Sequence, residues 1–350
     1  MTFPFNVYLA ALASAFLTTL LSLPLWTKWC LRAGLVDKPN HRKLHDHPVP
    51  LAGGLAVMAG LLAPVVLASA FLFGAGVHRG LHSTTLPPDP SHSDVARMAL
   101  DMNPAYLLQY GLSHRALQLA AIFAGAIGSL LVGWLDDKHE LRPLVKFGGQ
   151  VLVALVVAAS GVRITLFVHN ALFQYAVTIL WIVAVINACN FTDNMNGLCA
   201  GLSAIAAGYF GLLAAGQGQY LVALIAFLTC GALLGFLPYN FPQARAFLGD
   251  AGSHLLGFLL AVLAILPHFY TPLHSRRWAV LIPLLVLAVP LLDMLWVVLL
   301  RWRLGQPVYQ ADTNHLSHRL VRLGISPKHA VLVLWLAATI VGALALMLAD

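Results

Sequence analysis

The sequence predicts an all-α integral membrane protein, and both its composition and the length of its apolar segments support this fold class. Of the 350 residues, 60% are hydrophobic and only 9% are charged, and the mean hydropathy is +0.82. Soluble globular domains carry about 25% charged residues, so an ordinary water-soluble enzyme is excluded, and the low charge also excludes a disordered chain. Apolar runs long enough to cross a bilayer as helices recur along the whole chain.

We expect about ten transmembrane helices in one membrane domain over residues 1–350, because no repeat or flexible linker divides the chain. Residues 75–115 are predicted to form a long extracytoplasmic loop, whose scattered histidines leave a metal-binding tract as the less favoured alternative. Residues 301–328 are predicted to form a second loop, rich in His and Arg. The apolar runs lie near 5–31, 51–74, 116–135, 144–160, 171–188, 198–215, 219–238, 253–270, 278–300 and 329–348.

The basic residues predict how the chain is oriented in the membrane. Fourteen of the twenty Lys and Arg residues follow the first, third, fifth, seventh or ninth apolar run. The positive-inside rule places these segments in the cytoplasm and both termini outside, as for a multi-pass protein of the plasma (inner) membrane. Orientation also explains the net charge of +7, so no nucleic-acid partner is expected. The four cysteines lack the spacing of a zinc site.

Five short polar stretches interrupt the apolar runs, and two runs separate each stretch from the next. They are residues 37–54, 136–143, 187–197, 247–253 and 301–328. All five therefore emerge on one face of the membrane, predicted to be cytoplasmic. Together they bring carboxylates, amides and imidazoles to one surface, as an active site at the membrane interface requires. A proton-coupled transporter is the alternative, although transporters more often place polar groups near the bilayer midplane.

The second stretch begins with two adjacent carboxylates. Asp136 and Asp137 end the third apolar run, where mutual repulsion and the negative end of a helix dipole both disfavour them. A cation must therefore compensate them. Either Lys138 or Lys146 supplies it, or a divalent ion such as Mg²⁺, which takes oxygen ligands and substrate phosphates.

The third and fourth stretches add amides and two more carboxylates. Asn187, Asn190, Asp193 and Asn194 recur at intervals of three or four, so one helix face presents them if the helix continues that far. This pattern suits metal or sugar-hydroxyl binding, but also helix capping. Asp250 lies among small residues before the eighth run, where it either stabilises the helix dipole or holds a metal-bound diphosphate.

The fifth stretch and the run before it contain the remaining candidates. Asp293 lies inside the ninth apolar run, where an ionisable residue is either functional or hydrogen-bonded to a neighbouring helix. His315, His318, Arg319 and Arg322 have the spacing of one helix face. They either contact phosphate oxygens or form a basic surface against anionic lipid.

Taken in order, these motifs resemble those of the polyprenyl-phosphate N-acetylhexosamine-1-phosphate transferase family. The resemblance runs from Asp37 to about residue 345 and is to the WecA/TagO-like branch of glycosyltransferase family 4, which is related to MraY. The matching blocks are Asp37 through Gly54, DDK at 136–138, NxxNxxD at 187–193, FLGDAGS at 247–253, and Asp293 in the penultimate helix.

Three residues depart from the family pattern. Asn196 stands where the family has a second Asp, and Thr313 and Ser317 stand where its basic-loop motif has an Arg and a His. MraY members carry a run of three histidines, which this sequence lacks, so transfer of phospho-MurNAc-pentapeptide is disfavoured.

The resemblance implies an enzyme that acts on a lipid-held phosphate. A UDP-N-acetylhexosamine donor would give its sugar-1-phosphate, GlcNAc-1-phosphate foremost, to a polyprenyl (undecaprenyl) phosphate acceptor in the membrane lipid, releasing UMP and starting a cell-surface glycan. The implied cofactor is Mg²⁺, with Mn²⁺ as the alternative ion. A homodimer is left open.

The resemblance also assigns roles to individual residues of this sequence. The implied catalytic residues are Asp136, Asp137, Asp193 and His315. The implied metal ligands are Asp250, Asp137 and Asp193. The implied substrate-binding residues are Lys43, Asn187, Asn190, Asn196, His318 and Arg319.

Overall fold

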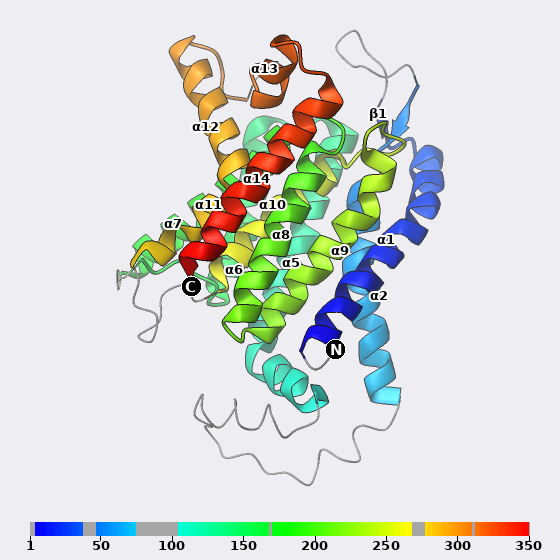
Figure 1. Cartoon of the computed structure of the whole chain (residues 1–350), viewed down its shortest axis with the longest axis vertical. Helices are drawn as coiled ribbons and strands as arrows, with labels where there is room; N and C mark the ends of the chain where they lie inside the picture. The colour runs from blue at the N-terminus through cyan, green and yellow to red at the C-terminus, as the bar shows by residue number, and fades with distance from the viewer. Residues whose placement is uncertain are drawn as a thin grey trace.

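Helices account for almost all of the regular structure, as the apolar runs predict. The computed structural model describes residues 4–37, 47–74, 104–166, 168, 170–267, 277–309 and 312–349. Figure 1 shows the long helices packed side by side as a bundle, with α13 and β1 at one end and both chain termini away from that end. The α-helices are α1 (Phe5–Ala33), α2 (Gly53–Gly74), α5 (Pro104–His139), α6 (Pro143–Ala159), α7 (Ala171–Thr192), α8 (Leu198–Gly216), α9 (Tyr220–Asn240), α10 (Gly249–Ile265), α11 (Ile282–Val286), α12 (Ala288–Arg303), α13 (Leu316–Arg322) and α14 (Pro327–Ala349).

Local sequence signals set several of the helix ends. α1 ends at Gly34, whose φ of 71° is the left-handed conformation that glycine adopts at helix C-termini. Pro143 occupies the first turn of α6, where its missing N–H removes no helical hydrogen bond. At the start of α7, the Asn170 side chain accepts a hydrogen bond of 3.0 Å from the backbone N–H of Phe173.

The predicted fold class is confirmed, and each predicted apolar run falls on a helix. Within the described ranges, seven helices are long and apolar enough to cross a membrane: α1, α2, residues 115–139 of α5, α7, α8, α9 and α14. An eighth span is formed if residues 279–286 and α12, which are bent by 73°, count as one. α6 and α10 are apolar but have only 17 residues each, about 25 Å of helix. This length falls short of the hydrocarbon core of about 30 Å.

The structure gives helical form to parts of the two predicted loops. Residues 104–115 form the first turns of α5, which is kinked at Arg115, while residues 75–103 lie outside the described residues. Within 301–328, α12 continues to Arg303, α13 forms over 316–322, and α14 starts at Pro327. The His and Arg side chains of this segment are therefore partly on a helix.

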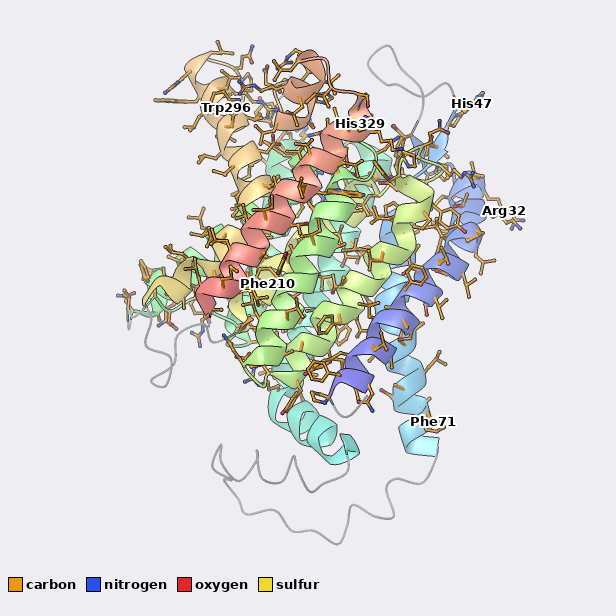
Figure 2. All side chains as sticks on the ribbon, viewed as in Figure 1. Arg32, His47, Phe71, Phe210, Trp296 and His329 are labelled. Carbon is orange, nitrogen blue, oxygen red and sulfur yellow. The ribbon has the colours of Figure 1, made fainter. Side chains whose placement is uncertain are left out.

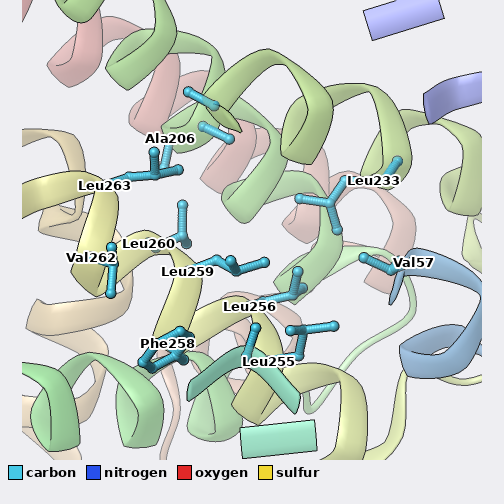
Figure 3. Close-up of a cluster of buried hydrophobic side chains, with 14 of the residues drawn as sticks. Val57, Ala206, Leu233, Leu255, Leu256, Phe258, Leu259, Leu260, Val262 and Leu263 are labelled. Carbon is cyan, nitrogen blue, oxygen red and sulfur yellow. The ribbon is translucent and has the colours of Figure 1, made fainter. Parts of the chain in front are cut away.

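α10 lies in the middle of the bundle and is buried on nearly all sides. It packs against α5, α7, α2 and α8, and Figure 3 shows its Leu and Phe side chains among those of neighbouring helices. A helix that is apolar around its whole circumference belongs in the interior. Gly257 permits a close approach, since a Cβ there would lie 2.4 Å from the Ile186 Cα. The N-terminus of α10 is thereby fixed relative to several helices at once.

Two short strands complete one end of the bundle. β1 (Val36–Asp37) pairs antiparallel with β2 (Val49–Pro50). Just beyond β2, the Gly53 N–H donates to the Phe247 carbonyl at 2.9 Å, immediately before α10. Figure 2 places Trp296, His329 and His47 at this end of the molecule and Phe71 at the other.

Candidate active site

The N-terminus of α10 is where side chains from distant polar stretches meet. The Asp137 carboxylate accepts hydrogen bonds from the backbone N–H groups of Asp250, at 2.8 Å, and Ala251, at 3.0 Å. Asn190 donates from Nδ2 to Asp250 Oδ1 at 2.8 Å. With the Gly53 bond to Phe247 described above, the second, third and first polar stretches all contact the fourth. We call Asp136, Asp137, Lys146, Asn190 and Asp250 the α10 centre.

Lys146 is the cation beside Asp136, the first member of the acidic pair. Its Nζ lies 2.6 Å from Asp136 Oδ2 and 2.6 Å from Asp250 Oδ2, so one ammonium joins two carboxylates. The Lys146 and Asp136 side chains are largely shielded from solvent, whereas that of Asp250 is 32% exposed. Lys138, the other lysine that the sequence left open, instead lies over the Trp134 ring at 5.1 Å. Of these two alternatives, the structure selects Lys146.

Asp137 has a different role from its neighbour, because both of its oxygens are engaged by α10. A carboxylate at a helix N-terminus satisfies free N–H groups and interacts favourably with the helix dipole. Glycines make room for this contact. A Cβ at Gly133 would lie 2.1 Å from the Asp250 carbonyl oxygen, and one at Gly249 would lie 2.7 Å from Asp137 Oδ2. Gly249 also has a φ of 72°, which disfavours other residues.

Asn187 and Asn190 lie on the last turns of α7, but the helix ends at Thr192, so Asp193 and Asn194 follow the helix and do not share its face. Asn190 bonds both Asp250 and Ser253 Oγ, the latter at 3.1 Å. Asn187 lies one turn deeper and donates to Gln150 Oε1 at 2.7 Å. Asn194, just beyond the helix, accepts from Ser317 Oγ at 2.7 Å. That last bond brings the fifth polar stretch to the third.

Asp193 caps the C-terminus of α7 without an engaged side chain. No hydrogen bond reaches its carboxylate from the described residues. Burial, followed by the negative charges of Asp250 and Asp137, raises the pKa of Asp193 to about 8. It is therefore a carboxyl group that retains its proton to unusually high pH beside the α10 centre.

A buried polar chain beneath the α10 centre was not predicted from the sequence. His254 Nδ1 lies 2.6 Å from the Asp250 carbonyl oxygen, and its Nε2 lies 2.9 Å from Gln150 Nε2. Both side chains are almost fully buried. The spacing in the sequence could have indicated this chain. Gln150 follows Lys146 by four residues on α6 and His254 follows Asp250 by four on α10, so each pair lies on one helix face.

A second group of ionisable side chains, the histidine cluster, consists of Asp293, Arg301, Asp312, His315 and His318. Asp293 Oδ2 lies 2.7 Å from His315 Nδ1, so Asp293 makes the buried hydrogen bond that was one of its two predicted alternatives. Arg301 donates to Asp312 Oδ2 at 2.8 Å and also to the Val308 carbonyl.

Phe191 connects the two groups, because it follows Asn190 in α7. Its ring meets His315 edge-on, with centroids 5.8 Å apart, and the Arg301 guanidinium lies 5.1 Å from the same ring. The histidine cluster is thus packed against the helix end that also supplies Asn190 to the α10 centre.

Two pKa values of the histidine cluster are shifted. Burial raises the pKa of Asp312, but hydrogen bonds from Arg301 and the Asn314 backbone outweigh it and hold the value below its ordinary range. Burial, together with the neighbouring His315 and Arg322, lowers the pKa of His318. At neutral pH, Asp312 is therefore charged and His318 is neutral.

The remaining predicted substrate-binding residues lie farther from the α10 centre. The Arg319 guanidinium covers the Trp296 ring at 4.6 Å, and the ring of His318 is 6.4 Å from that of His315. Asn196 donates to the Pro242 carbonyl at 3.3 Å. Lys43 lies outside the described residues.

The described residues contain no group of three or more His, Cys, Asp or Glu side chains arranged to hold a metal ion. The predicted set of Asp250, Asp137 and Asp193 is therefore not assembled as three ligands. Asp136 and Asp250 instead form a pair around one cation. Magnesium is usually bound by one or two carboxylates together with substrate phosphates, so a carboxylate pair fits this ion.

Comparisons with known proteins identify the family of this chain. The family model "Glycosyl transferase family 4" matches residues 119–268, which include α6, α7, α9 and all of α10. A Bacillus subtilis (strain 168) protein named a probable undecaprenyl-phosphate N-acetylglucosaminyl 1-phosphate transferase is 31% identical over 95% of this chain and 82% of its own length.

Two further relatives carry similar names. A Mycobacterium tuberculosis decaprenyl-phosphate N-acetylglucosaminephosphotransferase is 32% identical over 89% of this chain and 74% of its own length. The Escherichia coli (strain K12) undecaprenyl-phosphate alpha-N-acetylglucosaminyl 1-phosphate transferase is 27% identical over 96% of this chain and 82% of its own length. By its match to the Bacillus subtilis relative over nearly its whole length, this multi-pass membrane chain belongs to the polyprenyl-phosphate N-acetylhexosamine-1-phosphate transferase family, within glycosyl transferase family 4.

Proposed function

We propose that this protein transfers N-acetylglucosamine-1-phosphate from UDP-N-acetylglucosamine to a polyprenyl phosphate, releasing UMP. The observation that carries the proposal is that three polar stretches, distant from one another in the chain, contact the fourth at the start of α10 in a chain of this family. An oxygen of the acceptor phosphate attacks the sugar-bearing phosphorus. A new P–O bond forms, and the bond from that phosphorus to the UMP oxygen breaks. The transporter alternative has no support from the relatives, whose names all describe transferases.

We propose that Asp136 and Asp250 hold a Mg²⁺ ion, with Mn²⁺ as the alternative. Their Oδ2 atoms share one cation in the structure, and carboxylate oxygens are the ligands that Mg²⁺ prefers. When bound, the ion neutralises the diphosphate and stabilises the departing UMP. The predicted metal-ligand roles of Asp137 and Asp193 stay predictions.

The other groups of the α10 centre have roles that follow from their contacts. Lys146 places a positive charge between two carboxylates, where it limits their repulsion and attracts phosphate. Asp137 holds the first turn of α10 in place through two backbone N–H groups. Asp193 has no hydrogen bond from the described residues and carries a proton at neutral pH, so we propose that it donates a hydrogen bond to a phosphate oxygen. Phosphoryl transfer depends mostly on such positioning and charge neutralisation.

The histidine cluster is proposed to bind donor phosphates. Imidazole and guanidinium groups are suitable partners for phosphate oxygens. Phe191 joins His315 to the helix end that carries Asn190, so the cluster borders the α10 centre. We propose the same contact for His318 and Arg319, and for Lys43 from the first polar stretch.

The test is an assay with the purified full-length protein, UDP-N-acetylglucosamine, undecaprenyl phosphate and Mg²⁺. We expect UMP and a lipid-linked N-acetylglucosamine diphosphate to appear in equal amounts, and chelation with EDTA to stop both. UDP-N-acetylgalactosamine and UDP-glucose test the choice of sugar. Absence of UMP with every donor would overturn the proposal, and undiminished activity after chelation would overturn the metal.

Sidedness is tested with the same donor, which does not cross membranes. From the distribution of Lys and Arg we propose that the α10 centre lies at the cytoplasmic face. Sealed inside-out vesicles should therefore make product, and sealed right-side-out vesicles should make it only after detergent is added. If only sealed right-side-out vesicles made product, the α10 centre would face the outside and both termini would face the cytoplasm.

A further inference from the structure

A buried carboxylate within the bent span has a contact that the proposed function does not use. Asp293 of α12 is only 3% exposed, and His315, which it contacts, is 5% exposed. Asp293 Oδ2 lies 2.7 Å from His315 Nδ1, and Asp293 Oδ1 accepts from the Leu316 backbone N–H at 2.6 Å. One carboxylate thus fixes both the ring of His315 and the first residue of α13.

The chemistry of this pair selects one form of the imidazole. An ionised carboxylate only accepts hydrogen bonds, so the nitrogen that faces it must carry the proton. His315 Nδ1 is therefore the N–H donor, and Nε2 is the nitrogen with a free lone pair. Within the described part of the chain, Nε2 has no hydrogen-bond partner. The second nitrogen of the ring remains available to a ligand.

The position of the ring is fixed from three elements. Asp293 reaches it from α12, and the Phe191 ring of α7 packs against it at 89° with a centroid distance of 5.8 Å. The residue two places further on, Ser317, is tied to Asn194 by a hydrogen bond of 2.7 Å. An ionisable group such as Asp293 is energetically unfavourable within a membrane-spanning helix. A histidine that only filled space would not require such a partner.

We propose that Asp293 is a positioning residue for phosphoryl transfer: it holds His315 with Nδ1–H toward the carboxylate, so that Nε2 faces the donor and donates to a phosphate oxygen once Nε2 carries a proton. This inference rests on the proposed function. When Nε2 carries a proton, Asp293 also stabilises the charged ring. Groups that orient a functional histidine in this way typically change activity by about 10- to 100-fold when removed.

The first experiment is a double-mutant cycle on the full-length protein, with labelled lipid product as the sensitive readout. Asp293→Asn should lower kcat about 10- to 100-fold. In a His315→Gln background, Asp293→Asn should lower kcat less than twofold, because the imidazole through which Asp293 acts is already absent. Equal losses in both backgrounds would overturn the proposal.

Asp312→Asn is the matched control. Asp312 also binds one cation, Arg301, and one backbone N–H of the same segment, that of Asn314 at 2.7 Å, yet it does not bond His315. If Asp293 merely ordered the segment, both aspartates would behave alike. We expect the effect of Asp312→Asn on kcat to multiply with that of His315→Gln. Coupling of the same size for Asp312 would mean a structural role and overturn the proposal.

A spectroscopic measurement reads the tautomer in the unaltered protein, and a variant serves only to assign the signals. In full-length protein with ¹⁵N-labelled histidines, the His315 signals are those that vanish in His315→Gln. Where the ring is neutral, they should show a protonated Nδ1 and an unprotonated Nε2, and the reverse pattern would overturn the proposal. If the unaltered protein forms no product but shows this pattern, the proposed function fails while the tautomer assignment holds.

Discussion

The α10 centre and the histidine cluster are assembled in opposite ways. In the α10 centre, the contacts join residues far apart in the chain: 104 positions separate Lys146 from Asp250, and 113 separate Asp137 from Asp250. In the histidine cluster, the ion pairs are local, with 11 positions between Arg301 and Asp312 and 22 between Asp293 and His315. The α10 centre therefore depends on the packing of the whole bundle, whereas the ion pair and the carboxylate–imidazole contact of the histidine cluster lie within one segment that packs against α7 through Phe191.

The two groups also differ in how their charges are compensated. In the α10 centre one ammonium serves two carboxylates, so the removal of Lys146 leaves two neighbouring carboxylates uncompensated. In the histidine cluster, each carboxylate has its own cation or imidazole and one backbone N–H. Changes in the α10 centre should thus disturb activity and stability together, and changes in the histidine cluster should leave stability nearly intact.

The largest effect is expected for Asp250→Asn. Asp250 accepts from Lys146 and Asn190 and is a proposed ligand of the metal, so its negative charge contributes to both. We expect kcat for UMP release to fall by roughly 10²–10³-fold or more, as for the loss of one major electrostatic contact. Glu140→Gln removes an exposed carboxylate near the same end and should change kcat less than twofold. Near-normal UMP release by Asp250→Asn would remove the α10 centre from the reaction.

Lys146→Met tests whether the ammonium and a divalent ion act on the same carboxylates. Without the ammonium, Asp136 and Asp250 repel each other. We expect the free energy of unfolding to fall by roughly 3 kcal/mol or less, because the two carboxylates are partly solvent-accessible. Added Mg²⁺ should raise Tm more in Lys146→Met than in the unaltered protein, since the ion binds the freed carboxylates. Thermal unfolding with and without Mg²⁺ measures this difference.

Lys138→Met is the control for that measurement, because Lys138 lies over Trp134 and outside the pair. Its Tm should respond to Mg²⁺ as the unaltered protein does. An equal response in all three proteins would show that Mg²⁺ does not bind where Lys146 pairs with the carboxylates, and the proposed ligand pair would be wrong.

Much of the fold could be predicted from the sequence, since apolar length alone identifies the helices. Counting the runs also predicted that the five polar stretches emerge on one face, and the bonds through Asp137, Asn190, Gly53 and Ser317 join them. The short α6 and α10 were not distinguishable from full spans. Their apolar character resembles that of the other helices, and only the packing shows that α10 is central.

The roles within the acidic pair could not be predicted. Neighbours on a helix point about 100° apart, so Asp136 meets Lys146 while Asp137 meets α10. The rotation of each helix is set by packing against other helices rather than by its own sequence. For the same reason, the choice between Lys138 and Lys146 stayed open, and His254 and Gln150 were missed. For Asp293, the sequence left open a functional role or a buried hydrogen bond, and it did not identify His315 as the partner.

Gly133→Ala tests how strictly the α10 centre depends on helix packing. The added methyl would lie 2.1 Å from the Asp250 carbonyl oxygen, so α5 and α10 must move apart. We expect a loss of about 1–3 kcal/mol in stability, as for other overpacked sites, together with a lower kcat. Gly148→Ala on α6 meets nothing within 4 Å and should be neutral or stabilising. Unchanged Tm and kcat in Gly133→Ala would show that the centre tolerates displacement of α10.

The smallest effect is expected in the histidine cluster. Asp312→Asn should lower stability at pH 7 by about 1 kcal/mol, because the amide oxygen of Asn can still accept a hydrogen bond from the buried Arg301 side chain, which also binds the Val308 carbonyl. The pKa of Asp312 is held below its ordinary value, so its contribution is present above pH 4 and is lost as the pH falls through its folded-state pKa. Tm measured from pH 7 down to pH 3 should therefore decline less steeply in Asp312→Asn than in the unaltered protein, and the two curves should converge at low pH. Parallel curves would mean that Asp312 contributes no charge-dependent stability, and the histidine cluster would then be held by its backbone contacts alone.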